Sequence, residues 1–266
     1  MARKRGTSGN DITRGTNSND LIEGLGGDDS LHGGNGDDRI LGGSGNDRLY
    51  GGHGADDLIG GSGRDRCYGG NGADDIIGGD GDDVLLGGEG FDDIFGGNGN
   101  DQIFGQAGND ELSGDAGSDR VDGGAGNDEL EGGSGNDNLR GGAGDDELSG
   151  GAGQDTQTGG AGIDEFKVIE GDTGADAATR DFITDFEVNV DDIDLQLIDG
   201  NKDVRLVFVE AAGGSFVGGG INSLRFDQDA ANGWTLIEAD LNGDGVADIQ
   251  LQLTGLLNLS DEDFNL

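Results

Sequence analysis

The sequence predicts an all-β solenoid followed by a separate β-rich segment, and three features lead to this prediction. A nine-residue unit repeats without a frame break over residues 6–167, which gives 162/9 = 18 copies. Each copy ends in a short alternation of polar, apolar and polar residues, and beyond residue 167 longer apolar alternations replace the repeat. Fixed spacing of this kind indicates stacked units that each contact only their neighbours.

The repeated unit combines turn residues with a minimal strand. Its first place is Gly in all 18 copies, its fourth is Gly in 17, with Ser18 as the exception, and its sixth is Asp in all 18. The eighth place is apolar in 16 copies and fails only at Thr13 and Gln157. We expect turns over the first six places, where Gly and a fifth-place Asn or Asp tolerate left-handed backbone. The last three places predict a strand whose middle side chain faces a thin Leu/Ile core.

Composition restricts the class of protein. The chain has 61 Gly but no Pro and no Gly-X-Y period, so it is not collagen-like. Its formal net charge of -41 and 5% aromatic content are typical of disordered chains, and the acidity argues against a nucleic-acid partner. The single Cys67 excludes an internal disulfide framework and, at an eighth place, is expected to be a small buried hydrophobe.

The sequence predicts neither an N-terminal signal peptide nor a membrane-spanning helix. Residues 1–5 form a basic tail, and because no apolar stretch follows them we do not expect an N-terminal signal peptide. No apolar run approaches the length of a membrane-spanning helix, so no transmembrane segment is predicted.

The repeat array needs a ligand to fold. One apolar side chain per nine residues gives little burial against the conformational entropy of a Gly-rich backbone. Residues 6–167 also hold 35 Asp+Glu against 8 Lys+Arg, a net charge of 8 - 35 = -27. A sixth-place Asp in every copy, beside turn carbonyls, supplies the hard oxygen ligands that suit Ca²⁺ better than Zn²⁺ or Cu²⁺. We therefore expect multiple calcium ions between turns, with copies n and n+2 adjacent.

The unit Gly-Gly-x-Gly-x-Asp-x-apolar-x resembles the RTX (haemolysin-type) calcium-binding nonapeptide. The resemblance implies a parallel β-roll of about 18 nonapeptide copies, with two copies per turn and Ca²⁺ held between successive turns by the sixth-place Asp and main-chain carbonyls. Carried over by position, the implied metal ligands are Asp11, Asp20, Asp29, Asp38, Asp47, Asp56, Asp65, Asp74, Asp83, Asp92, Asp101, Asp110, Asp119, Asp128, Asp137, Asp146, Asp155 and Asp164.

Some copies depart from the pattern. The second-place Gly is replaced at five positions, and the fourth-place Gly is replaced at Ser18, so weaker sites are expected near the N-terminus and around residues 105–119. The five second-place exceptions are Thr7, Thr16, Leu25, Gln106 and Asp115. The first two copies are better interpreted as a cap.

A boundary near residue 168 is predicted where the Gly period stops. Residues 181–186, 192–197, 204–209, 224–226, 235–239 and 248–253 are interpreted as strands. Trp234 and most Phe residues after Phe166 are expected to form the core of this C-terminal β domain, residues 168–266, which would cap the solenoid.

The C-terminal region also resembles that of the serralysin family of secreted zinc metalloproteases. The resemblance covers roughly residues 160–266 and rests on residues 180–186 and 191–195 and on the closing Asp263-Phe264-Asn265-Leu266. It implies an uncleaved C-terminal signal read by a type I (ABC) exporter, and hence a secreted, extracellular protein. Asn265 departs from the mostly apolar tail that such signals have.

A second candidate calcium loop spans residues 240–248. Its oxygen-bearing residues Asp240, Asn242, Asp244 and Asp248 resemble an EF-hand loop. Leu251 stands where that loop has Glu, and both flanks predict strands, so a hairpin loop is the favoured form. A plain acidic turn is the alternative.

The sequence predicts no enzyme. The serralysin zinc helix His-Glu-x-x-His is missing, since His32 and His53 are isolated within repeats, and no nucleophile elbow or phosphate loop occurs. We expect a secreted calcium-binding protein that folds after export. The alternatives are the export portion of a larger secreted enzyme, such as a serralysin-type metalloprotease, and a membrane-active, host-surface (nodulation-type) or adhesive protein.

Overall fold

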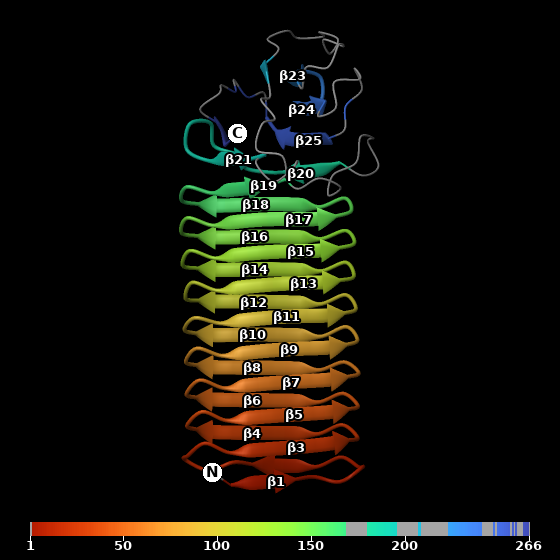
Figure 1. The fold of residues 1–266 in the computed structure, drawn as a ribbon, viewed down its shortest axis with the longest axis vertical. Helices are drawn as coiled ribbons and strands as arrows, with labels where there is room; N and C mark the ends of the chain where they lie inside the picture. The colour runs from red at the N-terminus through yellow and green to blue at the C-terminus, as the bar shows by residue number, and fades with distance from the viewer. Residues whose placement is uncertain are drawn as a thin grey trace.

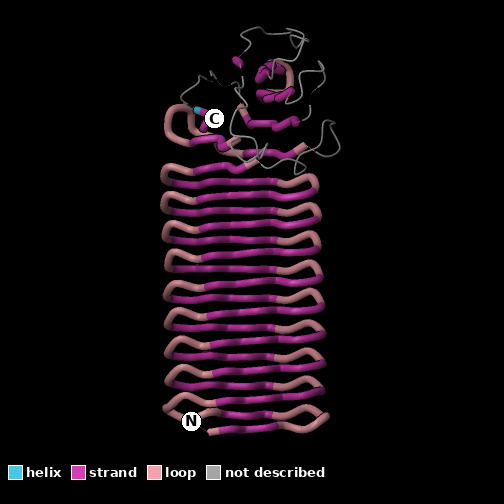
Figure 2. Tube along the Cα trace, viewed as in Figure 1, coloured by secondary structure: helices cyan, strands magenta, loops and turns pink. Residues whose placement is uncertain are grey.

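The structure is a computed structural model of the chain, shown as a ribbon in Figure 1, and it describes residues 2–168, 180–195, 207–208, 223–240, 247, 249–255, 257, 259 and 263–265. Its repeat region is a regular stack of strands with turns along both edges, as Figure 2 shows. No helix long and apolar enough to cross a membrane occurs in these residues.

The described residues form 26 strands. In chain order they are β1 (Arg3–Arg5), β2 (Ile12–Arg14), β3 (Leu21–Gly26), β4 (Ser30–Asn35), β5 (Arg39–Ser44), β6 (Arg48–His53), β7 (Asp57–Ser62), β8 (Arg66–Asn71), β9 (Asp75–Asp80), β10 (Val84–Glu89), β11 (Asp93–Asn98), β12 (Gln102–Ala107), β13 (Glu111–Ala116), β14 (Arg120–Ala125), β15 (Glu129–Ser134), β16 (Asn138–Ala143), β17 (Glu147–Ala152), β18 (Thr156–Ala161), β19 (Glu165–Lys167), β20 (Asp181–Ile183), β21 (Asp192–Asp194), β22 (Val207–Phe208), β23 (Ser223–Asp229), β24 (Trp234–Asp240), β25 (Ile249–Thr254) and β26 (Phe264–Asn265).

The strands build two sheets that face each other across the roll. Sheet A runs β1-β3-β5 through the odd strands to β19, then β21 and β26, and sheet B runs β2-β4-β6 through the even strands to β18, then β20, β25, β24, β23 and β22. Within the repeats each strand pairs in parallel with the strand two copies away, so that Leu58 lies opposite Ile76. The structure therefore confirms the expected parallel β-roll with two copies per turn.

The strands are longer than the sequence predicts. From β3 to β18 each has six residues, covering places seven to nine and the first three places of the next copy, as in β7. The expectation of turns over all six opening places was wrong. Gly60 and Gly61 have low strand propensity, but their backbone extends the ladder with the next turn, where Gly61 lies opposite Gly79.

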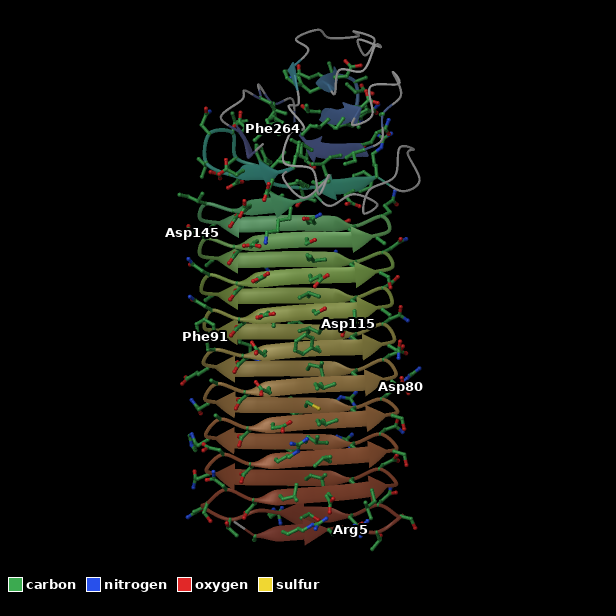
Figure 3. The ribbon with its side chains drawn as sticks, in the orientation of Figure 1. Arg5, Asp80, Phe91, Asp115, Asp145 and Phe264 are labelled. Atoms are coloured by element: carbon green, nitrogen blue, oxygen red, sulfur yellow. The ribbon has the colours of Figure 1, made fainter. Side chains whose placement is uncertain are left out.

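The left-handed backbone occurs at the fourth-place glycines from Gly27 onward, as expected, but also at the second place and not at the fifth. Second- and fourth-place glycines have positive φ, for example 115° at Gly61 and 130° at Gly63, whereas no fifth-place residue of the described chain does. The fifth-place Asn and Asp side chains instead accept hydrogen bonds from the turn above: the Arg64 N–H donates to Asn46 Oδ1 at 2.9 Å. Their prevalence therefore reflects a ladder along the edge of the roll, where Asp145 lies in Figure 3.

The core is one column of eighth-place side chains. These residues, from Ile22 to Phe166, are at most 2% exposed, and they include Cys67 and the polar Gln157. Burial raises the pKa of the Cys67 thiol well above its ordinary value, so the prediction of an inert buried hydrophobe is confirmed.

The C-terminal segment extends this core. Phe166, Phe186 and Phe264 belong to the same cluster as the eighth-place column. Around them the core is mainly aliphatic, with Ile183 and Leu253 fully buried. Trp234 is only half-buried and does not belong to this cluster, so the prediction that it forms part of the core was wrong. Parallel pairing of β18 with β20 and of β19 with β21 carries both sheets across residue 168.

The predicted C-terminal strands are present as β20 to β25: β20 to β22 are shorter than predicted, β23 and β24 are longer, and β25 is shifted by one residue. Residues 196–197, 204–206, 209 and 248, which were also predicted to be in strands, lie outside the described residues.

Candidate metal centres

The sixth-place aspartates line the inner edges of the roll. Each follows the fourth-place Gly turn and immediately precedes a strand, which turns its side chain inward. From Asp20 to Asp164 these residues are at most 3% exposed, whereas Asp11, in the first copy, is half-buried. Burying a row of carboxylates is expensive unless each is paired or bound to a cation.

One oxygen of each carboxylate holds the preceding turn. The Asp47 N–H donates to Asp65 Oδ1 at 2.7 Å, and the Asp83 N–H donates to Asp101 Oδ1 at the same distance. The pattern repeats every 18 residues, so each aspartate joins two turns through its backbone and its side chain. Sequence reasoning missed this structural role, although the strict 18-residue interval between paired copies was the signal for it.

The second oxygen has no hydrogen-bond donor in the repeats between the two ends of the roll. The orphaned Oδ2 atoms belong to Asp29, Asp38, Asp47, Asp56, Asp65, Asp74, Asp83, Asp92, Asp101, Asp110, Asp119, Asp128, Asp137 and Asp146. A buried unpaired carboxylate oxygen is costly in itself, and here the cost recurs in successive copies.

Each orphaned oxygen lies beside a glycine and a carbonyl of the next turn. A Cβ on Gly60 would lie 2.6 Å from Asp65 Oδ2 and 2.7 Å from the Gly78 carbonyl oxygen, and the same trio recurs around Gly78 with Asp83 and Gly96. The first-place glycine is therefore required because a side chain would fill the space on which these oxygens converge.

Burial shifts the pKa of these carboxylates upward. Burial, opposed by the backbone hydrogen bond and supported by neighbouring carboxylates, raises the pKa of Asp74 and Asp83 to about 7. The pKa of Asp65 is raised to about 6 by the same burial. A nearby cation would reverse this effect by favouring the charged form.

This donor set fits a hard divalent cation. No group of three or more His, Cys, Asp or Glu side chains able to hold a metal occurs in the part of the chain that the structure describes. One or two carboxylate oxygens together with main-chain carbonyls are ligands that Ca²⁺ accepts in flexible geometry, whereas Zn²⁺ prefers nitrogen and sulfur.

The first two copies satisfy their aspartates differently. Thr16 donates its N–H and its hydroxyl to Asp20 Oδ2 at 2.7 and 2.8 Å. Thr7 likewise donates its N–H and its hydroxyl to Asp11 Oδ2 at 2.6 and 2.9 Å. A hydrogen bond from the Ala2 N–H, with those from Thr16, lowers the pKa of Asp20 despite its burial. These threonines donate hydrogen bonds to the Oδ2 atom, which has no donor in the copies from Asp29 to Asp146. This difference supports the interpretation of the first two copies as a cap.

The other residues that replace the second-place Gly keep the positive φ of that position. Leu25, Gln106 and Asp115 have φ of 83°, 81° and 67°, a conformation that costs about 1 kcal/mol or more for a residue with a Cβ. The neighbouring Asp29 and Asp110 nevertheless have orphaned Oδ2 atoms. The substitutions strain these turns without changing the carboxylate geometry, and weaker binding there stays a prediction.

Three aspartates beyond the repeats continue the pattern. Asp181 and Asp191 accept the N–H groups of Asp155 and Asp164 at 2.9 and 3.1 Å, and Asp263 accepts the Asn189 N–H at 2.7 Å. A strand was predicted from Asp181 and another directly after Asp191, whereas the segment from Asp263 was assigned to the implied export signal. None of the three side chains was predicted to join turns. Their spacing of 26 and 27 residues hides them from an 18-residue search, although Asp181-Phe182-Ile183 keeps the order of places six to eight.

The candidate loop of Asp240, Asn242, Asp244 and Asp248 falls on side chains outside the described residues. Its flanks are described: β24 and β25 pair antiparallel, with Ala239 opposite Ile249. The prediction that strands flank this loop is therefore confirmed, and calcium binding by its four residues stays a prediction.

The two histidines show no catalytic arrangement in the described structure. His32 stacks on Tyr50 with ring centroids 4.5 Å apart on the outer face of sheet B, and His53 is exposed at the end of β6. Both therefore lie on the surface of the roll, as expected.

Comparison with known proteins identifies the repeat array. The profile of the RTX calcium-binding nonapeptide repeat (4 copies) matches residues 5–40, 32–67, 68–103, 95–130 and 131–166. The chain belongs to the RTX calcium-binding repeat family. Its array accordingly binds multiple calcium ions. No curated protein matches the chain.

Three solved structures are similar to this RTX protein. The R3 subunit of the AlgE6 mannuronan C5-epimerase from Azotobacter vinelandii is 24% identical, and the match covers 71% of this chain and 80% of the subunit with a TM-score of 0.35. The R2 subunit of the same enzyme is 22% identical, and the match covers 71% of this chain and 90% of the subunit with a TM-score of 0.36. The extracellular lipase LipA from Serratia marcescens is 20% identical over 99% of this chain and 40% of the lipase, with a TM-score of 0.27.

Proposed function

We propose that this RTX protein is a secreted, non-enzymatic calcium-binding protein whose roll folds when calcium reaches it outside the cell. The observation that carries the proposal is the row of buried carboxylates with one orphaned oxygen each. Without a cation these groups oppose folding, and with one they join successive turns. Calcium binds the folded chain far better than the unfolded chain, so its binding energy becomes folding energy.

The sixth-place aspartates of the inner turns, Asp29 to Asp164, would hold the ions together with first-place glycine carbonyls of the adjacent turn. Asp11 and Asp20 are set apart from this group, since Thr7 and Thr16 already occupy their Oδ2 atoms. The bound ion supplies positive charge between layers, and the chain supplies the oxygen positions and excludes water from them.

The proposal includes export of the unfolded chain by an ABC-type exporter that reads the segment around Asp263 and Phe264. In the folded chain Phe264 is 7% exposed, β26 pairs with β21, and Asp263 is hydrogen-bonded to Asn189. An exporter of the ABC type could read this segment only before the roll is complete. A low-calcium cytosol that keeps the chain unfolded and an extracellular space near millimolar calcium would provide that order of events.

Circular dichroism during a calcium titration tests the proposal. The chain should be mostly unordered in excess chelator and should gain β signal cooperatively as calcium is added. Magnesium at the same concentration is the control, because its smaller octahedral shell suits carbonyl-rich sites poorly. A spectrum that is already β-rich in chelator at neutral pH would refute calcium-driven folding.

A further inference from the structure

The two outer faces of the roll carry opposite charge. On strands β2 to β18 of sheet B, places seven and nine hold five arginines and one carboxylate, Asp122. The five are Arg14, Arg48, Arg66, Arg120 and Arg140. In an array with a net charge of -27, places seven and nine of this sheet have a net charge of 5 - 1 = +4.

Sheet A carries the matching acidic row. One carboxylate stands at place seven of every strand from β7 to β19, in direct register from strand to strand. The row consists of Asp57, Asp75, Asp93, Glu111, Glu129, Glu147 and Glu165. Like charges opposite each other in a sheet are unfavourable, and a partner of positive charge would relieve this.

The cations of sheet A are already engaged, whereas key cations of sheet B are not. Arg39 pairs with Asp57 at 3.2 Å, and Lys167 pairs with Glu147. No ion pair within the described residues involves Arg48 or Arg66, which are exposed on adjacent strands. The unpaired arginines Arg48 and Arg66 therefore lie on sheet B. Carboxylates of sheet A that enter no ion pair within the described residues, such as Asp75 and Asp93, lie on the opposite face.

Both faces also have an apolar stripe at place nine. On sheet B it consists of His32, Tyr50, Tyr68, Leu86 and Phe104, and on sheet A of Leu41, Ile59, Ile77 and Phe95. Ile77 and Phe95 are 41% and 39% exposed. On each face the stripe runs two residues away from the charged column, with the same 18-residue spacing between strands.

We propose that sheet B of one chain docks on sheet A of a second copy, with the axes of the two rolls antiparallel. Strands of the two sheets run in opposite directions within one roll (Figure 1). Reversing the second roll therefore brings its place-seven carboxylates over the place-seven arginines and keeps the apolar stripes together. Parallel axes would place the charged columns at opposite edges.

This contact does not close on itself. The docked pair still has one free sheet A, on the first copy, and one free sheet B, on the second, so the interface is heterologous and further copies add laterally. The inference rests on the proposed calcium-loaded roll, because calcium in the interior reduces the overall repulsion between copies. The stacked rings favour a flat protein partner over a sugar ring: Tyr50 and Tyr68 lie 4.9 Å apart at 5° and cover each other's faces.

Sedimentation velocity in saturating calcium, over a concentration series, tests the docking. The parent chain should form species larger than a monomer, and Arg48→Gln/Arg66→Gln should weaken association at least tenfold. Arg64→Glu changes the net charge by the same amount in a turn, where Arg64 pairs with Asp82, and should leave association unchanged. Calcium-induced circular dichroism verifies that each variant folds, which separates a failed interface from failed calcium folding.

Reversed charges give a decisive second arm. Arg48→Glu/Arg66→Glu and Asp75→Arg/Asp93→Arg should each be defective alone, and an equimolar mixture should associate again because each variant restores the other's partner. A parent chain that stays monomeric while folded, or a mixture without rescue, would overturn the proposal. Binding of that monomer to vesicles of anionic lipid or to polygalacturonate would also overturn it and would assign the basic face to an anionic partner.

Discussion

The main-chain N–H of Asp47 donates a 2.7 Å hydrogen bond to Oδ1 of Asp65, two copies further along the chain. This bond fixes the carboxylate of Asp65 so that its Oδ2, which has no donor, stays buried beside Gly60. The two oxygens therefore have separate roles, one in joining turns and one in binding a cation. Substitutions that distinguish the oxygens should separate folding from calcium binding.

Asp65→Asn should keep the turn-joining acceptor and lose the charge. We expect the calcium midpoint of folding to rise, with a loss of about 1–3 kcal/mol at fixed calcium, while the metal-free chain loses less stability or gains some. Isothermal titration with atomic-emission counting of bound calcium measures both effects. Asp80→Asn, which makes the same charge change at the edge of the roll (Figure 3), is the control. Equal effects of the two variants would show that only net charge matters.

Thr16→Val tests whether the Thr16 hydroxyl stabilises the N-terminal cap. The variant keeps the N–H donor to Asp20 Oδ2 and removes the hydroxyl donor at 2.8 Å. Loss of one charge-assisted bond to a buried carboxylate should destabilise the N-terminal turns by about 1.5–3 kcal/mol. Hydrogen exchange of residues 12–35 should increase in calcium-loaded protein, with exchange near residues 120–150 unchanged. Protection that stays unaltered at the N-terminus would contradict a capping role of the hydroxyl.

Stability of the metal-free chain should increase in acid. Burial raises the pKa of Asp74, Asp83, Asp119 and Asp128 to about 7, whereas an unfolded aspartate titrates near pH 4. Between about pH 4 and 7 the folded chain therefore binds more protons than the unfolded chain, so its stability rises as the pH falls through this window. Circular dichroism in chelator should show more β signal at pH 5 than at pH 8.

The same protons compete with calcium. At pH 6, calcium binding should release protons, because the ion requires carboxylates that are partly protonated in the metal-free roll. A calorimetric titration repeated in buffers of different ionisation enthalpy measures the number released. No proton release at pH 6 would show that the sixth-place carboxylates are not the ligands.

Much of this fold could be predicted from the sequence because the same nine-residue unit recurs along the whole roll. The eighth-place core and the position of the sixth-place Asp between turns follow from one nine-residue unit, and the parallel pairing of copies n and n+2 is what its resemblance to the RTX nonapeptide implies. The six-residue strands could not be predicted from propensity, since Gly60 and Gly61 join β7 only through hydrogen bonds with the next turn. Likewise, the role of Asp181 depends on a 26-residue connection whose length carries no period.

From Gly27 to Gly162, the fourth-place glycines should not tolerate a side chain, for a steric reason as well as a conformational one. Gly63 has φ of 130°, and a Cβ there would overlap the carbonyl oxygen of Gly45 in the preceding turn. Gly233 also has positive φ, 72°, but nothing lies within 4 Å of its added Cβ. Gly233→Ala should therefore cost only the conformational penalty of about 1–2 kcal/mol, whereas Gly63→Ala should cost clearly more, because two turns must separate and the oxygens that converge between them lose their spacing. Thermal unfolding in saturating calcium compares the two variants, and calcium counting on each should show a deficit for Gly63→Ala alone. Similar losses in both would mean that the roll can absorb a methyl group between its turns.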